Sequence, residues 1–279
     1  MQTRTIELSS KEGDVYEIAL YDAENRVPDR PLLLVLDAPY LFGTVVETVF
    51  IQAVADEIEP PIVAGLAVKG SLTDHATQRV RDYTPAFASK DAVRQSIVWP
   101  MIDALRRNTG RDLGDLLGGA QAFREFICER ALPAIHAECR YAPDEIGLLG
   151  HSASGVFGHH FLLADENPFS RMILGSVGVG WYGEPDINLE KHLLRHKATT
   201  SPIQIFQGVG AEELYHPAFG PTLEAGLGAL KKLADTFPDK LQLTQKVFDG
   251  ETHASVMAPL VAAGVRSHYG AGRSFMDAL

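Results

Sequence analysis

The chain has 279 residues, of which 46% are hydrophobic and 22% are charged, so it is long enough to bury a sizeable core. Its 25 Lys and Arg residues stand against 36 Asp and Glu residues, which gives a formal net charge of −11 at pH 7. This acidic balance lacks the positive potential that nucleic-acid backbones require, and it disfavours anionic membrane surfaces. We therefore expect neither nucleic acid nor a membrane among the partners.

The N-terminal residues and the cysteines bear on the compartment. No run of 18 apolar residues occurs, and the N-terminus alternates polar and apolar residues instead of placing a basic stretch before an apolar one. Cys128 and Cys139 fall in one predicted helix, where eleven residues at about 1.5 Å each separate them by roughly 16 Å. A continuous helix excludes a disulfide between them. The sequence therefore predicts an unexported, cytoplasmic protein.

The hydrophobic periodicity predicts strands that alternate with helices. Residues 3–8 and 14–21 alternate as two strands of a hairpin. Residues 31–37 form a continuous apolar run that ends in Asp37-Ala38-Pro39, typical of a strand buried on both faces of a parallel sheet. The elements expected after it are helix 41–57, strand 62–68, helix 120–138, strand 145–149, a helix after 153, strands 172–177 and 203–207, helix 221–235, strand 241–248 and a helix from 254.

This order predicts an α/β fold in which a mostly parallel sheet, with an antiparallel N-terminal hairpin, is covered by helices on both faces. No repeat, low-complexity tract or linker interrupts residues 1–279, so a single domain is expected. Residues 69–119 break the pattern with Gly, Asp, Arg, Thr and Pro. We expect an irregular, loop-rich insertion there that shapes the functional site.

The strongest chemical signal lies around Ser152. The stretch Gly150-His151-Ser152-Ala153-Ser154 stands between a predicted strand and a predicted helix, which is the context of a nucleophile elbow. Small residues are needed two positions on either side of the serine because the turn is crowded. The amide of Ala153 would then point at a developing oxyanion from the helix N-terminus.

A serine of ordinary pKa needs a base, and the base needs a group that orients it. His253 follows the last predicted strand, the place of the base when the chain order is nucleophile, acid, histidine. The acid is expected after strand 203–207, where Glu212 and Glu213 are adjacent and the residues alone do not choose between them. A Ser-His dyad without an acid stays an alternative.

Several motifs in order resemble an esterase family of the α/β hydrolases, and within it the branch of the siderophore trilactone esterases that act on ferric enterobactin and salmochelin. The motifs are Leu36-Asp37-Ala38, Arg79-Val80-Arg81-Asp82-Tyr83-Thr84-Pro85, the elbow, Val209-Gly210 with Glu213, and residues 248–256. The resemblance implies an α/β-hydrolase fold and places the family's acid on Glu213. Some members of that branch work with a dyad, which keeps the acid open.

Two departures from the family pattern concern the elbow and the oxyanion hole. The elbow carries Ser154 where glycine is usual, a small change in size. In relatives of this family the second oxyanion donor is the backbone amide that falls here on Pro39, which has no N–H. Loss of one donor costs about 10² to 10³ in rate. We expect the amide of Ala38 or Tyr40, or the Tyr40 hydroxyl, to replace it.

The sequence thus predicts a serine hydrolase that cleaves a small-molecule carboxylic ester through an acyl-enzyme. A weakly active or non-catalytic binding member, motivated by Pro39, and an acyl-transferase are the alternatives. Arg81 is a candidate for an acidic or phenolic substrate group, although an ion pair with Asp82 is the simpler interpretation, and Trp181 is expected to line the acyl or alcohol pocket. No motif indicates a metal or organic cofactor. Association of identical copies is left open.

Overall fold

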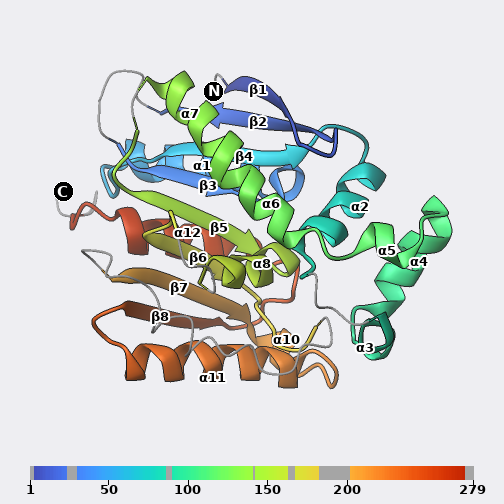
Figure 1. The fold of residues 1–279 in the computed structure, drawn as a ribbon. Coiled ribbons are helices and arrows are strands. Elements are labelled where there is room, and N and C mark those ends of the chain that lie inside the picture. Colours follow the sequence, from blue (N-terminus) through green and yellow to red (C-terminus); the bar gives the residue numbers. More distant parts are fainter. Residues whose placement is uncertain are drawn as a thin grey trace.

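The computed structural model describes residues 3–23, 30–85, 90–140, 142–162, 167–181 and 202–273. Within them an eight-stranded sheet has the order β1-β2-β4-β3-β5-β6-β7-β8 (Figure 1). Its strands are β1 (Thr3–Ser9), β2 (Val15–Tyr21), β3 (Leu32–Val35), β4 (Ile62–Val68), β5 (Ile146–His151), β6 (Arg171–Gly175), β7 (Ile203–Gly210) and β8 (Leu241–Phe248). β1 pairs antiparallel with β2 and β2 antiparallel with β4, whereas all later pairs are parallel. The predicted fold class is confirmed.

Helices cover both faces of the sheet (Figure 1). They are α1 (Ala38–Val54), α2 (Leu72–Tyr83), α3 (Lys90–Gln95), α4 (Trp99–Thr109), α5 (Leu113–Leu116), α6 (Ala120–Phe126), α7 (Leu132–Cys139), α8 (Ala153–Leu162), α10 (Ala211–Leu214), α11 (Gly220–Thr236) and α12 (Met257–Tyr269). The apolar run of β3 divides between the faces: Leu32 and Leu34 join the core under α6 and α8, and Leu33 and Val35 join the core under α1 and α12. Burial on both faces explains why this strand does not alternate.

The segment 69–119 departs from the expectation of an irregular insertion, because most of its described residues are helical. Helix α2 begins with a capping box, in which the Ser71 hydroxyl accepts from the Asp74 amide and the Asp74 carboxylate accepts from the Ser71 amide. The helix has few apolar residues, so hydrophobic periodicity does not predict it. The capping box stabilises its N-terminus. Helices α2 to α5 lie beyond the carboxyl ends of the strands, at the right of Figure 1.

The predicted helix 120–138 is present but contains a π-helical turn, Ile127–Ala131, between α6 and α7. Pro133 follows directly in the first turn of α7, where its missing N–H removes one intrahelical hydrogen bond beside this turn. Cys128 lies in this π-helical turn, and Cys139 is the last residue of α7. Across the described part of the chain, no helix is long and apolar enough to span a bilayer.

Candidate active site

Backbone strain gathers at the carboxyl ends of three neighbouring strands. Asp37 follows β3 with φ 53°, Ser152 follows β5 with φ 60°, and Ser176 follows β6 with φ 49°. The other described non-glycine residues with positive φ, Asp56 and Arg140, follow the last turns of α1 and α7. A left-handed conformation costs a side-chain-bearing residue about 1–3 kcal/mol and concentrates at functional sites. This edge of the sheet is therefore the candidate site.

Ser152 occupies the sharp turn from β5 into α8, as the elbow motif predicts. Gly150 is required there, because a Cβ at this position would lie 2.6 Å from the Ser154 carbonyl oxygen. Ser154 replaces the usual glycine without leaving a buried polar group unpaired. Its hydroxyl accepts from the His151 amide at 2.9 Å and donates to the His151 carbonyl at 3.0 Å.

Ser152, His253 and Glu213 form a hydrogen-bonded chain across three elements. The Ser152 Oγ lies 3.0 Å from Nε2 of His253, and Nδ1 of His253 lies 2.6 Å from Oε2 of Glu213. His253 follows β8, and Glu213 sits in α10 directly after β7. Glu212 is exposed, whereas Glu213 is 5% exposed. Of the two adjacent carboxylates, the structure brings Glu213 to the histidine.

The second carboxylate oxygen of Glu213 is also held. Its Oε1 accepts from the Ser176 hydroxyl at 2.7 Å and from the Gly210 amide at 2.9 Å. Burial opposes ionisation of this carboxyl, but the hydrogen bonds from His253, Ser176 and Gly210 outweigh it and lower its pKa. Glu213 is thus ionised at neutral pH and fixed at both oxygens.

His151, next to the serine in sequence, completes the network behind the site. Its Nε2 lies 3.1 Å from the Ser176 Oγ, and its ring centroid lies 4.7 Å from that of His253. Burial and the neighbouring His253 lower the pKa of His151 to about 3, so its ring is neutral. Because the Ser176 hydroxyl gives its single proton to Glu213, Nε2 of His151 must carry the proton and donate to Ser176.

Sequence reasoning did not single out Ser176 or His151 for a role. The signal that could have found Ser176 is its position at the carboxyl end of the predicted strand 172–177, which neighbours the strand of Ser152 in the sheet. Carboxyl ends of adjacent parallel strands meet at one edge of the sheet.

The candidate oxyanion donors differ in whether their backbone amide already has a hydrogen-bond acceptor. Pro39 stands in the first turn of α1, and the amide of Tyr40 donates to the Asp37 carbonyl at 2.9 Å. The expectation that the Tyr40 amide replaces the missing donor is therefore wrong. Ala38 and Ala153 are the first residues of α1 and α8, where helix geometry leaves an amide without an intrahelical acceptor. Tyr40 is among the residues that line the cavity at Ser152.

A cavity of about 540 Å³ opens at Ser152 and His253. Its described lining comprises Asp37, Tyr40, Leu41, Ala76, Arg79, Val80, Met101, Ala104, Leu105, Asn108, His151, Ser152, His253, Ala254 and Met257. A smaller cavity of about 300 Å³ is lined by Glu212, Glu213, His216, Phe219, Thr252 and His253. His253 thus lines both cavities.

An ion pair fixes the strained turn after β3. Nε of Arg79 lies 2.9 Å from each carboxylate oxygen of Asp37, and the Asp37 amide donates to the Tyr83 hydroxyl at 3.3 Å. Both partners of Asp37 belong to α2, so this helix holds the turn from which Ala38 begins α1.

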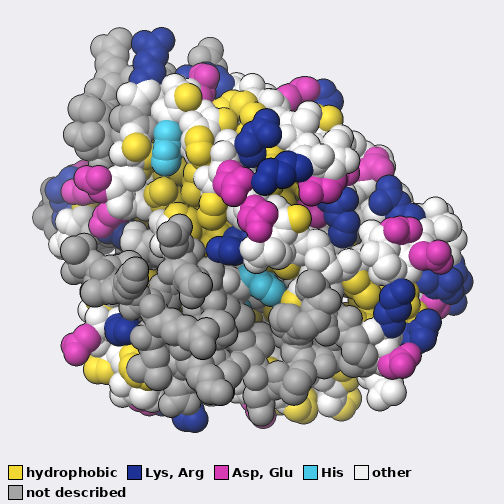
Figure 2. Space-filling view, in the orientation of Figure 1, with side chains coloured by type: hydrophobic (Ala, Val, Ile, Leu, Met, Phe, Trp, Pro, Cys, Tyr) yellow, Lys and Arg dark blue, Asp and Glu magenta, His cyan; other side chains and the backbone are white. Residues whose placement is uncertain are grey.

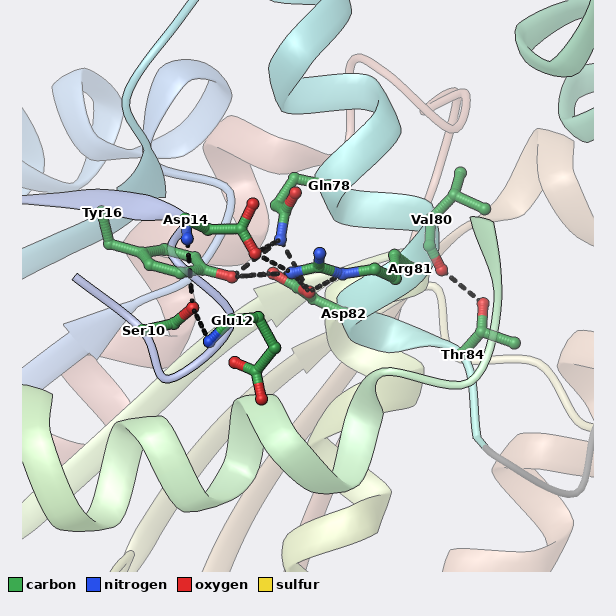
Figure 3. Close-up of polar contacts among 9 residues, drawn as sticks. All are labelled: Ser10, Glu12, Asp14, Tyr16, Gln78, Val80, Arg81, Asp82 and Thr84. Atoms are coloured by element: carbon green, nitrogen blue, oxygen red, sulfur yellow. Dashed lines mark hydrogen bonds and ion pairs between the residues drawn. The ribbon is translucent and has the colours of Figure 1, made fainter. Parts of the chain in front are cut away.

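Arg81 lies outside the wall of the cavity at Ser152, which corrects the expectation of a substrate contact. Its Nη2 lies 2.7 Å from Asp14 and 3.0 Å from Asp82, and Tyr16 and Gln78 share the cluster (Figure 3). The ion pair with Asp82, the simpler interpretation, is present. Burial raises the pKa of Asp82 to about 6 despite the guanidinium beside it. The cluster ties α2 to the N-terminal hairpin.

Trp181 also takes a different place from the one expected. It is 2% exposed and lines neither described cavity. Its indole N–H donates to the Thr222 hydroxyl at 2.8 Å, and its ring meets that of Phe219 edge to face at 5.9 Å. Trp181 therefore packs behind Phe219, which lies against the smaller cavity.

Comparison with known proteins adds a relative in sequence and similar solved structures. No protein-family model matches the chain. In sequence it is 26% identical over 265 residues to the ferri-bacillibactin esterase BesA of Bacillus subtilis (strain 168), covering 92% of this chain and 86% of that protein. The crystal structure of the BES protein from Bacillus cereus is similar over 95% of each chain, with a TM-score of 0.77 and 25% identity.

The siderophore hydrolase EstA from Aspergillus nidulans shares the fold, with a TM-score of 0.72 and 18% identity over 95% of this chain and 93% of its own. The chain thus has the α/β-hydrolase fold, and the resemblance to siderophore esterases indicated by its motifs is confirmed.

Proposed function

We propose that this protein hydrolyses carboxylic esters of a siderophore through an acyl-enzyme on Ser152. The observation that carries the proposal is the unbroken chain from Ser152 Oγ through His253 to an ionised Glu213. The esters cleaved by its relatives support the substrate class.

In the first half-reaction, Nε2 of His253 takes the proton of Ser152 as its Oγ attacks the ester carbonyl carbon. Glu213 accepts the Nδ1 proton in a hydrogen bond and stabilises the imidazolium that forms. The amides of Ala153 and Ala38 are the donors for the tetrahedral oxyanion. His253 then protonates the alcohol oxygen as the C–O bond breaks, which leaves the acyl group on Ser152.

In the second half-reaction, His253 takes a proton from water, whose oxygen attacks the acyl carbon. The intermediate collapses, Ser152 regains its proton from the histidine, and the carboxylic acid departs. An alcohol in place of water would give acyl transfer. Ala38 is the first residue of α1, so its amide has no acceptor within the helix, and its use as a second oxyanion donor would favour an active esterase over the weakly active or binding alternative that Pro39 suggested.

Labelling and hydrolysis test the proposal together. A fluorophosphonate probe should label the peptide containing Ser152 in the wild type and leave Ser152→Ala unlabelled. The wild type, but not Ser152→Ala, should open the ring of a catechol trilactone siderophore. Chromatography of the products, with and without an added alcohol, measures this reaction and distinguishes hydrolysis from acyl transfer. Labelling of Ser154 or Ser176, or equal hydrolysis by both proteins, would overturn the assignment. A cytoplasmic location stays a prediction from the sequence.

A further inference from the structure

The cavity at Ser152 has a wall built from two helical stripes. Met101, Ala104, Leu105 and Asn108 of α4 follow the spacing i, i+3, i+4, i+7, which places them on one side of the helix. From α2, the wall includes Ala76, Arg79 and Val80, again one face of a helix. Both stripes line the space in which the serine lies.

The other side of α4 is charged. Asp103 pairs with Arg106 at 3.1 Å and with Arg107 at 2.7 Å. In Figure 2 the surface formed by α3 to α5, at the right of the view, shows Lys and Arg next to Asp and Glu side chains. Met101, on the apolar stripe, keeps 46% of its surface exposed. The apolar side of this helix therefore borders a cavity that a ligand can fill.

The ionic groups in the wall are already paired. Asp37 and Arg79 neutralise each other inside the cavity, with side chains 6% and 20% exposed. Apart from this pair and the catalytic histidine, the described lining from α1, α4 and α12 is uncharged. A charged ligand group would compete with that internal pair, whereas an uncharged apolar group gains by burial against the stripes.

The positions of Ser152 and His253 together assign the two cavities. The alcohol oxygen must leave beside the histidine that protonates it, and His253 lines both cavities, whereas Ser152 is among the described lining residues of the larger one alone. The larger cavity contains Ser152, to which the acyl group becomes bonded. We propose that the space between α2 and α4 is the acyl subsite, that it takes an uncharged alkyl or aryl acyl group, and that α4 sets this specificity. The inference rests on the proposed esterase function.

Acyl-chain selectivity tests this subsite. With p-nitrophenyl esters from acetate to octanoate, kcat/KM should rise up to about fourfold per methylene that becomes buried. Ala104→Phe places a larger side chain in the cavity beside α4. It should lower kcat/KM for the octanoate ester at least tenfold while leaving kcat/KM for the acetate ester within about twofold. Arg107→Phe, on the charged side of α4, is the matched control and should behave as wild type. Equal effects of Ala104→Phe on both esters, or no chain-length dependence, would refute the subsite.

Failure of the esterase function can be told apart from failure of the subsite. Octananilide and acetanilide carry the same acyl groups on a stable amide, and calorimetry measures their binding without turnover. Octananilide should bind the wild type at least tenfold more tightly than acetanilide, and Ala104→Phe should lose this preference. Equal binding of the two amides contradicts the subsite whether or not esters are cleaved.

A separate observation concerns Ser176. Its side chain is fully buried, its φ of 49° is strained for a serine, and its hydroxyl joins Glu213 to His151. The geometry points to Ser176 as a positioning residue: its hydroxyl holds the Oε1 atom of Glu213, so that Oε2 faces His253.

Two substitutions distinguish the effect of the Ser176 hydroxyl from the effect of the strained backbone at this residue. Ser176→Ala removes the hydroxyl and keeps the Cβ, whereas Ser176→Gly removes both and suits the positive φ. Hydrogen bonds to charged groups imply about a ten- to hundredfold fall in kcat for both variants, with KM nearly unchanged. A limb of the pH profile that reports Glu213 should move to higher pH, because loss of this donor raises the pKa of that carboxyl. Wild-type kcat and pH profile in both variants would refute the assignment, and Ser170→Ala serves as a remote control.

Discussion

Glu213→Gln is the sharpest test of the hydrogen-bonded chain, because the surroundings decide how the new amide must lie. The Oε1 position receives hydrogen bonds from the Ser176 hydroxyl and the Gly210 amide, both donors. A glutamine must therefore place its carbonyl oxygen there and turn its NH2 group toward Nδ1 of His253.

An NH2 group facing Nδ1 forces the wrong tautomer of His253. Nδ1 must then accept, the proton moves to Nε2, and Nε2 can no longer take the proton of Ser152 at 3.0 Å. The same change in a Ser-His-Asp site lowers kcat by about 10⁴, so we expect a loss of this order. Because the substitution is nearly isosteric, KM and the folded structure should change little.

Burst kinetics with an activated ester and the rate of fluorophosphonate labelling would measure this loss. Glu212→Gln, one residue away and exposed, is the matched control and should keep wild-type rates. Near-wild-type activity of Glu213→Gln would contradict the relay and favour a Ser-His dyad. A crippled Glu212→Gln with an active Glu213→Gln would move the acid to the neighbouring residue.

Three further predictions follow from the site and its supports. Gly150→Ala puts a Cβ 2.6 Å from the Ser154 carbonyl oxygen, so the elbow must shift and kcat should fall about 10²-fold in an ester assay. Gly43→Ala, with open space around the new Cβ, is the control and should not affect kcat. Equal values of kcat for the two variants would refute the reasoning. Arg79→Met leaves the buried Asp37 without this ion pair, so it should cost about 2 kcal/mol of unfolding free energy and lower kcat. Arg81→Met should lower stability without changing kcat. Unchanged kcat in Arg79→Met would rule out a role for Arg79 in holding the Ala38 turn. Burial lowers the pKa of His159 to about 4, so stability present above pH 6.5 should be lost as the pH falls toward 4, by about 2 kcal/mol at pH 5. The difference in unfolding free energy between pH 7 and pH 5, measured with urea, should be smaller in His159→Phe than in the wild type. An identical difference in both proteins would show that His159 is not the source of this pH dependence.

Local patterns were sufficient for the sheet and for the order of the candidate catalytic residues. The apolar run 62–68 predicts a strand with the bounds observed for β4. The strand-to-helix context of Ser152 and the position of His253 after the last strand depend on short-range periodicity and chain order, which the sequence displays directly.

Helix α2 shows where periodicity alone was insufficient. Its residues are mostly polar, and the capping box at Ser71 and Asp74, although legible, is not an apolar signal. The helix is stabilised by partners far along the chain, such as Asp37 for Arg79 and Asp14 for Arg81. Which of the two arginines faces the cavity is decided by those partners.

Only the tertiary structure joins residues whose separation in sequence is large. Ser152 and His253 are 101 residues apart, and Ser176 and Glu213 are 37 apart, yet each pair is within hydrogen-bonding distance because the parallel strands β5 to β8 end at one edge of the sheet. The choice of Glu213 over Glu212 has the same origin. Neighbours on a short helix point in different directions, and only the one directed at β6 and the His253 loop meets donors that stabilise its charge.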